Sequence, residues 1–194
     1  MGQDKALMPF LGRPLILRIL ERLAPLADEI ILSANRPEDY AFLGLPTHPD
    51  LLPGCGVLGG LYTSLSAAKG DSVAVVACDM PFANSTLFEY EFDLLSKTGV
   101  DVVIPSTLEG LEPLHAVYRR ETCLPVIRSA LDSGQLKLIG WFPQVRLRMV
   151  TAVERERYDP SGLAFWNLNT QEEFRQAEER AGLEENQRDI SLDR

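Results

Sequence analysis

Apolar positions recur along the chain with two different spacings, which predict helices and strands in turn. Residues 15–26 place apolar side chains three or four positions apart, as on one face of a helix, and Pro14 suits a first turn. Residues 73–77 are instead apolar at consecutive positions, which is typical of a strand covered on both faces in a parallel sheet. By the same patterns we expect further helices at residues 37–43, 58–68, 86–97, 121–132, 136–142 and after 170, and extended segments at 29–33, 45–48, 100–105, 113–120 and 145–150.

This alternation of strands and helices predicts an α/β fold with three layers and a mostly parallel sheet. The polar stretch at residues 106–112 resembles a hairpin turn and predicts a mixed sheet edge. A chain of 194 residues suits one domain, which we place at residues 1–183. Residues 184–194 are polar and charged and are expected to form a frayed tail.

Composition narrows the classes of partner. The net charge is −9 and no block of Lys or Arg is present, which argues against binding nucleic acid or an anionic membrane by charge alone. No apolar run approaches the roughly 18 residues of a membrane span. The three cysteines, at positions 55, 78 and 123, lack metal-site spacing and are interpreted as reduced thiols of a cytoplasmic protein.

Two charged residues are candidates for chemistry. Asp79 follows the apolar run 73–77, and in open α/β sheets ligands bind beyond the carboxyl ends of the strands. Pro81 cannot continue a central strand, so an acid that merely forms a turn is the alternative. Lys5 is the one cation of the first ten residues and lies just before an apolar segment.

The glycines at residues 54–60 match the pattern G-x-G-x-x-G, but their context does not favour a dinucleotide site. Pro53 stands directly before Gly54, and no good buried strand precedes the loop, whereas the fingerprint needs a strand, a tight turn and a helix in that order. We therefore expect a glycine-rich loop that opens a helix and whose backbone can approach a ligand closely. A tight loop without ligand contact is the alternative.

Later in the chain, one histidine and two asparagines are weaker candidates. His115 lies in a predicted strand, where a structural hydrogen bond is the usual role. Asn167 and Asn169 are two positions apart, so in an extended segment both side chains project the same way. They precede a capping box, Thr170 to Glu173, that marks a helix start, and turn formation is the alternative role.

Six segments in register resemble the molybdenum cofactor guanylyltransferases (the MobA-like family), which resemble nucleotide-sugar pyrophosphorylases in fold. The resemblance implies a nucleotide-diphospho-sugar transferase-like, Rossmann-like architecture. Each segment is weak alone, but together they span nearly the whole chain. They are Met1-Gly-Gln-Asp-Lys-Ala-Leu7, Ser33-Ala-Asn-Arg36, Pro49-Asp50 with Gly56-Val-Leu-Gly-Gly60, Cys78-Asp-Met-Pro81, Glu112-Pro-Leu-His115 and Asn167-Leu-Asn-Thr170.

The resemblance implies a reaction and its partners. GMP would be transferred from GTP to molybdenum-molybdopterin, giving the guanine dinucleotide form of the cofactor and pyrophosphate. Mg²⁺ would be required, and GTP, the molybdopterin cofactor and other cofactor-maturation proteins would be the partners. The task is to bring two polyanions together and to neutralise growing charge.

Site residues follow from the resemblance by position. Lys5 and Asp79 would be catalytic, with Lys5 on the nucleotide phosphates and Asp79 on the metal. Asn169 is a second candidate ligand of the metal. The resemblance also assigns residues to the nucleotide (Asn35, Asp50, Gly56, Leu58, Gly59) and to the pterin or second phosphate (His115, Asn167, Asn169).

The sequence departs from the family at its start. The family begins with a buried strand and a loop of the type L-A-G-G-x-S-x-R, and neither is present before Met1, so the first strand of the fold is expected to be missing. Met1 as an internal methionine of a working enzyme is the favoured explanation, because a sheet without its middle strand leaves unpaired backbone groups. The alternatives are a cytidylyltransferase or other small nucleotidyltransferase, and a catalytically inactive module that binds the pterin or a partner.

Overall fold

The computed structural model describes the backbone of residues 4–192 and the side chains of residues 4–184. Residues 1–3 of the first matching segment, and the side chains of residues 185–194 in the predicted tail, therefore lie outside the described part of the chain.

A mixed four-stranded sheet forms the centre of the molecule, in the strand order β5-β7-β6-β8. Strand β7 is antiparallel to both of its neighbours, whereas β6 and β8 are parallel. Two small sheets accompany it, an antiparallel pair β1–β2 and a parallel pair β3–β4. The bounds are β1 Pro9–Phe10, β2 Arg13–Pro14, β3 Leu32–Ser33, β4 Thr47–His48, β5 Ser72–Val76, β6 Val102–Pro105, β7 His115–Arg119 and β8 Leu147–Val150.

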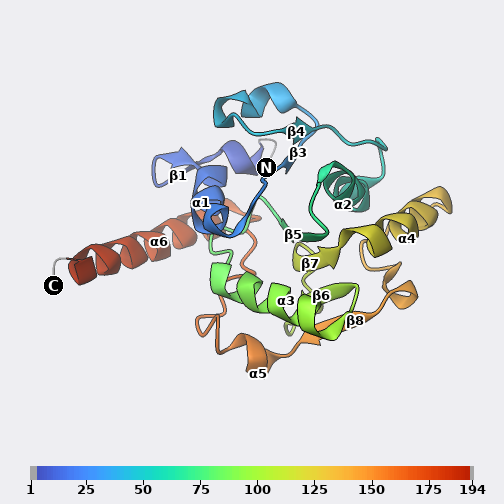
Figure 1. The fold of residues 1–194 in the computed structure, drawn as a ribbon. Helices are drawn as coiled ribbons and strands as arrows, with labels where there is room; N and C mark the ends of the chain where they lie inside the picture. Colours follow the sequence, from blue (N-terminus) through green and yellow to red (C-terminus); the bar gives the residue numbers. More distant parts are fainter. Residues whose placement is uncertain (1–3, 193–194) are drawn as a thin grey trace.

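Helices cover both faces of the central sheet, as Figure 1 shows, so the predicted three-layer α/β fold is confirmed. Alternate residues of β7 face opposite layers: Tyr118 packs with helices α2 and α4, and Val117 packs with α3. The helices are α1 Leu15–Leu23, α2 Gly56–Ala67, α3 Ser85–Thr98, α4 Arg120–Asp132, α5 Ala152–Arg155 and α6 Gln171–Leu192, with 3-10 helices η1 Lys5–Leu7, η2 Ala24–Leu26, η3 Pro37–Leu43 and η4 Phe142–Gln144.

The prediction for strand β5 is partly wrong. The segment is a strand, but it pairs only with β7, antiparallel, and among residues 4–192 no strand pairs with its other edge. Its residues are accordingly half-buried or exposed, in contrast to the fully buried β6. Apolar residues at every position did not distinguish a central strand from this edge strand, because pairing depends on distant segments.

The helix predicted at residues 136–142 is also wrong. The chain there forms turns, followed by the short η4. The Gln135 side chain accepts the Lys137 N–H, and the Trp141 indole donates to the Leu138 carbonyl, so local side chains take up backbone groups that a helix would use. Gly140 lies within this turn and Pro143 follows it, and both residue types are poor in helix interiors.

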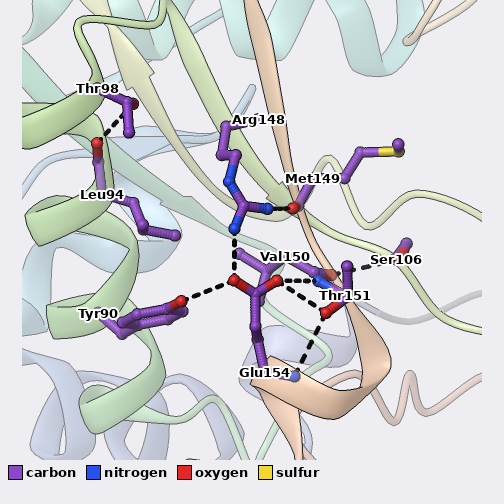
Figure 2. A network of polar contacts seen from close by, with 9 residues as sticks. All are labelled: Tyr90, Leu94, Thr98, Ser106, Arg148, Met149, Val150, Thr151 and Glu154. Carbon is purple, nitrogen blue, oxygen red and sulfur yellow. Dashed lines mark hydrogen bonds and ion pairs between the residues drawn. The ribbon is translucent and has the colours of Figure 1, made fainter.

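A short helix, α5, was not predicted although its capping box is present in the sequence. The Thr151 hydroxyl accepts the Glu154 N–H, and the Glu154 carboxylate accepts the Thr151 N–H. Figure 2 shows that Tyr90 and Arg148 bind the same carboxylate. Although desolvation favours the neutral acid, these hydrogen bonds hold the pKa of Glu154 at about 2.

The predicted frayed tail is helical over most of its length. Residues 184–192 continue α6, which projects away from the rest of the molecule (Figure 1). The helix is anchored at its start, where Phe174, Ala177 and Ala181 form an apolar face and are buried. Glu184 pairs with Arg18 of α1 at 3.2 Å, which extends the anchored part by one more turn. None of the helices among the described residues is both long and apolar enough to cross a membrane.

A buried acid and a buried histidine meet between α3 and β7. The side chains of Glu91 and His115 are fully buried, with His115 Nδ1 at 3.5 Å from Glu91 Oε1. Within the described residues, neither Glu91 oxygen has a hydrogen-bond partner. Burial raises the pKa of Glu91 well above its ordinary value and lowers the pKa of His115 to about 3, so both side chains are neutral near neutral pH.

Glu91→Gln should stabilise the protein in a pH-dependent way. Above the ordinary pKa of glutamate, the unfolded chain releases a proton that the folded Glu91 retains, so the free energy of unfolding falls as pH rises. Removing this acid should raise the melting temperature by roughly 2–4 °C at about pH 8 for a chain of this size and leave it unchanged at about pH 4. The buried His115 changes the free energy of unfolding with pH in the opposite direction, but it is present in both proteins and does not affect the comparison.

Thermal denaturation at the two pH values tests this, with Glu89→Gln as the control because Glu89 is exposed on the same helix. An equal change in melting temperature at both pH values would contradict the assignment of a neutral buried Glu91.

Candidate functional site

Lys5, Asp79 and Asn169 come together although they are far apart in the sequence. The Lys5 ammonium donates to Asp79 Oδ2 at 3.0 Å and to Asn169 Oδ1 at 2.8 Å. The side chains of Lys5 and Asp79 are 27% and 19% exposed, so the pair is partly desolvated but reachable from solvent. The structure thus brings together the two residues predicted to be catalytic and one of the two asparagines.

The backbone around Asp79 is fixed from several sides. Asp79 lies in the turn that follows β5, and its carbonyl accepts the Leu168 N–H at 3.0 Å. This bond joins the turn to the segment that carries Asn169. Arg18 and Arg22 of α1 donate to the carbonyls of Pro81 and Ala83, at 3.1 and 2.9 Å.

Asn169 is held by the capping box of α6, whose prediction is confirmed. The Glu173 carboxylate accepts the backbone N–H groups of Asn169 and Thr170, each at 2.7 Å, and the Thr170 hydroxyl accepts the Glu173 N–H at 3.1 Å. The two backbone bonds lower the pKa of Glu173. Asn167 offers its backbone carbonyl to the Asn169 amide at 3.5 Å, and its own predicted role stays a prediction.

Asn35 and Asp50 form a second polar pair. Asn35 follows β3 and Asp50 follows β4, and the carboxyl ends of these two parallel strands lie side by side. The Asn35 amide donates to Asp50 Oδ2, and Asn35 Oδ1 accepts the Asp50 N–H, both at 3.0 Å. Each side chain orients the other; Asn35 is exposed and Asp50 is partly exposed.

The glycine-rich loop is the start of α2 and lies close to this pair. Gly56 has a φ of +56°, which favours glycine, and opens the helix. A Cβ at Gly59 would lie 2.8 Å from the Cys55 Cβ, so this position needs glycine for packing. A Cβ at Gly60 would lie 3.8 Å from Asp50 Oδ1. Leu58 is fully buried in the core, so only its backbone can take the predicted nucleotide contact.

His115 lies apart from both polar groups. Its ring is fully buried, stacks on Phe88 with centroids 3.9 Å apart, and contacts the edge of Phe165. Its Nε2 accepts the Asn84 N–H at 3.3 Å. None of these contacts is with a predicted site residue. The structure gives His115 the structural hydrogen bond that was expected as its usual role, and the pterin contact implied by the resemblance stays a prediction.

Three residues that matter for the geometry were not singled out as site residues. Asp4 caps the short helix that carries Lys5 and accepts a hydrogen bond from Tyr40, and Glu173 holds Asn169. The capping box predicted Glu173 as a helix residue, but only the fold reveals that the box lies beside Lys5.

The lysine-centred group has the donor chemistry for a hard cation. Asp79 and Asn169 point a carboxylate and an amide oxygen at the same ammonium, and such oxygens suit Mg²⁺. Among the described residues no cluster of three or more His, Cys, Asp or Glu side chains could hold a metal ion. Two protein oxygens fit a Mg²⁺ ion that takes its remaining ligands from phosphate oxygens and water.

Comparison with known proteins finds relatives that match most of the chain. The family described as the MobA-like NTP transferase domain matches residues 1–147. A molybdenum cofactor guanylyltransferase from Desulfosudis oleivorans is 32% identical over 177 residues, covering 91% of this chain and 87% of that protein.

Solved structures share the fold. The molybdopterin-guanine dinucleotide biosynthesis protein A from Archaeoglobus fulgidus superposes with a TM-score of 0.80 at 24% identity, covering 93% of this chain and 92% of that one. A 2-C-methyl-D-erythritol 4-phosphate cytidylyltransferase from Thermus thermophilus superposes with a TM-score of 0.65 at 15% identity, covering 91% and 93%. The sheet and its helices are therefore those of the nucleotide-diphospho-sugar transferase fold.

Replacing Lys5 should cost little stability. The ion pair with Asp79 is partly exposed, so Lys5→Met should change the free energy of unfolding by less than about 1 kcal/mol. Ile104→Ala, in the buried strand β6, should cost about 2–5 kcal/mol and serves as the reference. Urea denaturation measures both, and a loss at Lys5 as large as that at Ile104 would mean that the lysine mainly serves folding.

Proposed function

The chain belongs to the family of MobA-like NTP transferase domains, and from this premise we propose that it transfers GMP from GTP to the terminal phosphate of molybdenum-molybdopterin. The products are the guanine dinucleotide form of the cofactor and pyrophosphate. The membership makes the protein a nucleotidyltransferase, and the choice of GTP, of the pterin and of Mg²⁺ is the proposal. The single observation that carries it is the contact of Lys5 with both Asp79 and Asn169.

That contact suits a reaction between two polyanions. A triphosphate and a phosphate nucleophile repel each other, so the protein has to supply positive charge and fixed geometry, and little covalent help. Lys5 is a cation in a partly desolvated place, where its interaction with phosphate oxygens is stronger than in bulk water. Its partners, Asp79 and Asn169, are oxygen donors that a phosphate-bound Mg²⁺ prefers.

In the proposed reaction, Asp79 and Asn169 would hold Mg²⁺, and Lys5 would turn from their oxygens to the α- and β-phosphates. Bound there, Mg²⁺ would neutralise phosphate charge and make the α-phosphorus more electrophilic. An oxygen of the pterin phosphate forms the new bond to the α-phosphorus, and the bond to the leaving pyrophosphate breaks. Lys5 stabilises the negative charge that grows on the leaving group.

We place the nucleoside at the Asn35–Asp50 pair. The pair fixes the orientation of an amide and a carboxylate, which can hydrogen-bond to a ribose or to a base edge, and the α2 loop allows close approach. By analogy with the family we assign guanine. A cytidylyltransferase of the same fold is the alternative, supported by the likeness to the Thermus thermophilus enzyme. Competition of GTP and CTP for the protein, measured by calorimetry with Mg²⁺, separates the two.

Asp79→Asn should abolish Mg²⁺-dependent binding of GTP while leaving the fold intact, because the carboxylate is the one charged protein ligand proposed for the metal. Calorimetry with GTP and Mg²⁺ measures this, and circular dichroism checks the fold. Asp93→Asn is the matched control, because Asp93 also pairs with a lysine, Lys97, but on the exposed face of α3. Mg²⁺-dependent turnover that survives Asp79→Asn would contradict the assigned ligand.

Lys5→Ala should remove about 3 kcal/mol of transition-state stabilisation, which lowers the rate of nucleotidyl transfer roughly 10²-fold. The same change removes the ammonium from the two oxygens assigned to the metal, so Mn²⁺ without nucleotide should bind at least as tightly as it binds the unaltered protein. Lys97→Ala controls for loss of a lysine elsewhere. Electron paramagnetic resonance measures the Mn²⁺ binding. Weaker Mn²⁺ binding in Lys5→Ala would show that Lys5 does not share the metal ligands.

A further inference from the structure

The position of Lys5 depends on a carboxylate next to it in the chain. Lys5 begins η1, a 3-10 helix of three residues, which is too short to hold its own orientation. Asp4 Oδ1 accepts the Ala6 N–H at 3.1 Å and thereby caps this turn. Asp4 Oδ2 accepts the Tyr40 hydroxyl at 2.7 Å. One oxygen of the Asp4 carboxylate thus holds the η1 turn itself, and the other joins this turn to Tyr40, which is distant in the sequence.

Tyr40 belongs to η3, between the strand that precedes Asn35 and the strand that precedes Asp50. Tyr40 is 5% exposed and packs in one cluster with Ala6 and Ile16. Burial and the hydrogen bond to Asp4 raise the pKa of Tyr40, so the hydroxyl stays protonated and acts as the donor. The bond therefore connects the segment that carries the Asn35–Asp50 pair to the turn that carries Lys5.

We propose that Asp4 and Tyr40 are positioning residues that aim Lys5 at the nucleotide phosphates and couple its place to the nucleoside side of the site. The consequence for catalysis rests on the proposed function, whereas the positioning itself does not. Lys5 reaches Asp79 and Asn169 only if η1 presents it in one direction, and η1 has no other side-chain cap than Asp4 among the residues described. Removing the Tyr40 hydroxyl should loosen this direction without removing any group from the site.

A second tyrosine provides a matched control. The Tyr90 hydroxyl donates to Glu154 Oε1 at 2.9 Å, so it too joins a phenol to a carboxylate that caps a helix start (Figure 2). Neither Tyr90 nor Glu154 contacts Lys5, Asp79 or Asn169. Tyr40→Phe and Tyr90→Phe therefore delete the same kind of hydrogen bond, one beside Lys5 and one remote from it.

Trace acetylation with acetic anhydride, read by peptide mass spectrometry, reports on Lys5 without nucleotide. An ammonium held by two oxygen acceptors reacts slowly, so Tyr40→Phe should raise the rate at Lys5 about two- to tenfold, the factor that corresponds to the net loss of one hydrogen bond. The other three lysines, Lys69, Lys97 and Lys137, are internal references whose rates should not change. Tyr90→Phe should leave all four rates unchanged.

Coupling provides the second readout. Asp4→Ala should raise the Lys5 rate, and adding Tyr40→Phe to it should have no further effect, because both changes break the same bond. An unchanged Lys5 rate in Tyr40→Phe, or additive effects in the double variant, would overturn the proposal. Equal increases at all four lysines would overturn it too, since they would mean general loosening of the fold.

Kinetics separates this proposal from the proposed function. If the unaltered protein transfers GMP, Tyr40→Phe should lower kcat/KM about two- to tenfold, and it should have no effect when added to Lys5→Ala. If the unaltered protein transfers no nucleotide, the proposed function fails, and the acetylation result still decides whether Tyr40 positions Lys5.

Discussion

One ammonium shared by two oxygen acceptors is the interaction around which the site is arranged. Lys5 lies in η1, Asp79 in the turn after β5, and Asn169 just before α6. Local sequence preferences alone would not bring these three residues together. The desolvation cost of their contact is small because all three side chains remain partly accessible to water, so the charge of Lys5 is not fully desolvated. A charge kept in this state is available to a ligand.

Several devices of backbone chemistry keep that contact in place. Asp4 caps the short helix η1, which carries Lys5, and its carboxylate accepts a backbone N–H there. At the start of α6, just after Asn169, the Glu173 carboxylate does the same for the Thr170 N–H. Both carboxylates satisfy N–H groups that would otherwise lack partners. The carbonyl of Asp79 accepts the Leu168 N–H, and Arg18 binds the loop just after Asp79. The site is therefore built on the ends of helices and strands.

Local patterns predicted much of this, and pairing between distant segments set the limit. The capping box at Thr170 and the acid at the end of the apolar run 73–77 both lie where the sequence placed them. The expectation that β5 is covered on both faces in a parallel sheet was wrong, because consecutive apolar residues do not tell which strands pair with the segment or what covers it. His115 could not be assigned either, since a histidine between apolar residues fits a core as well as a site, and only its stacking on Phe88 distinguishes them. Asp4 and Tyr40 were missed because their bond joins two short turns with no periodic signal.

The outer edge of β5 offers a place for one more strand. Residues Ser72–Val76 carry no lysine, glutamate or proline, and within residues 4–192 nothing pairs with that edge. Natural sheets usually protect such an edge with charged residues or a bend, because unpaired backbone N–H and C=O groups can pair with a further strand. A further strand that pairs along residues 72–76, whether it comes from this chain or from a second molecule, would satisfy these groups and cover Ala74, whose side chain is exposed within the described residues.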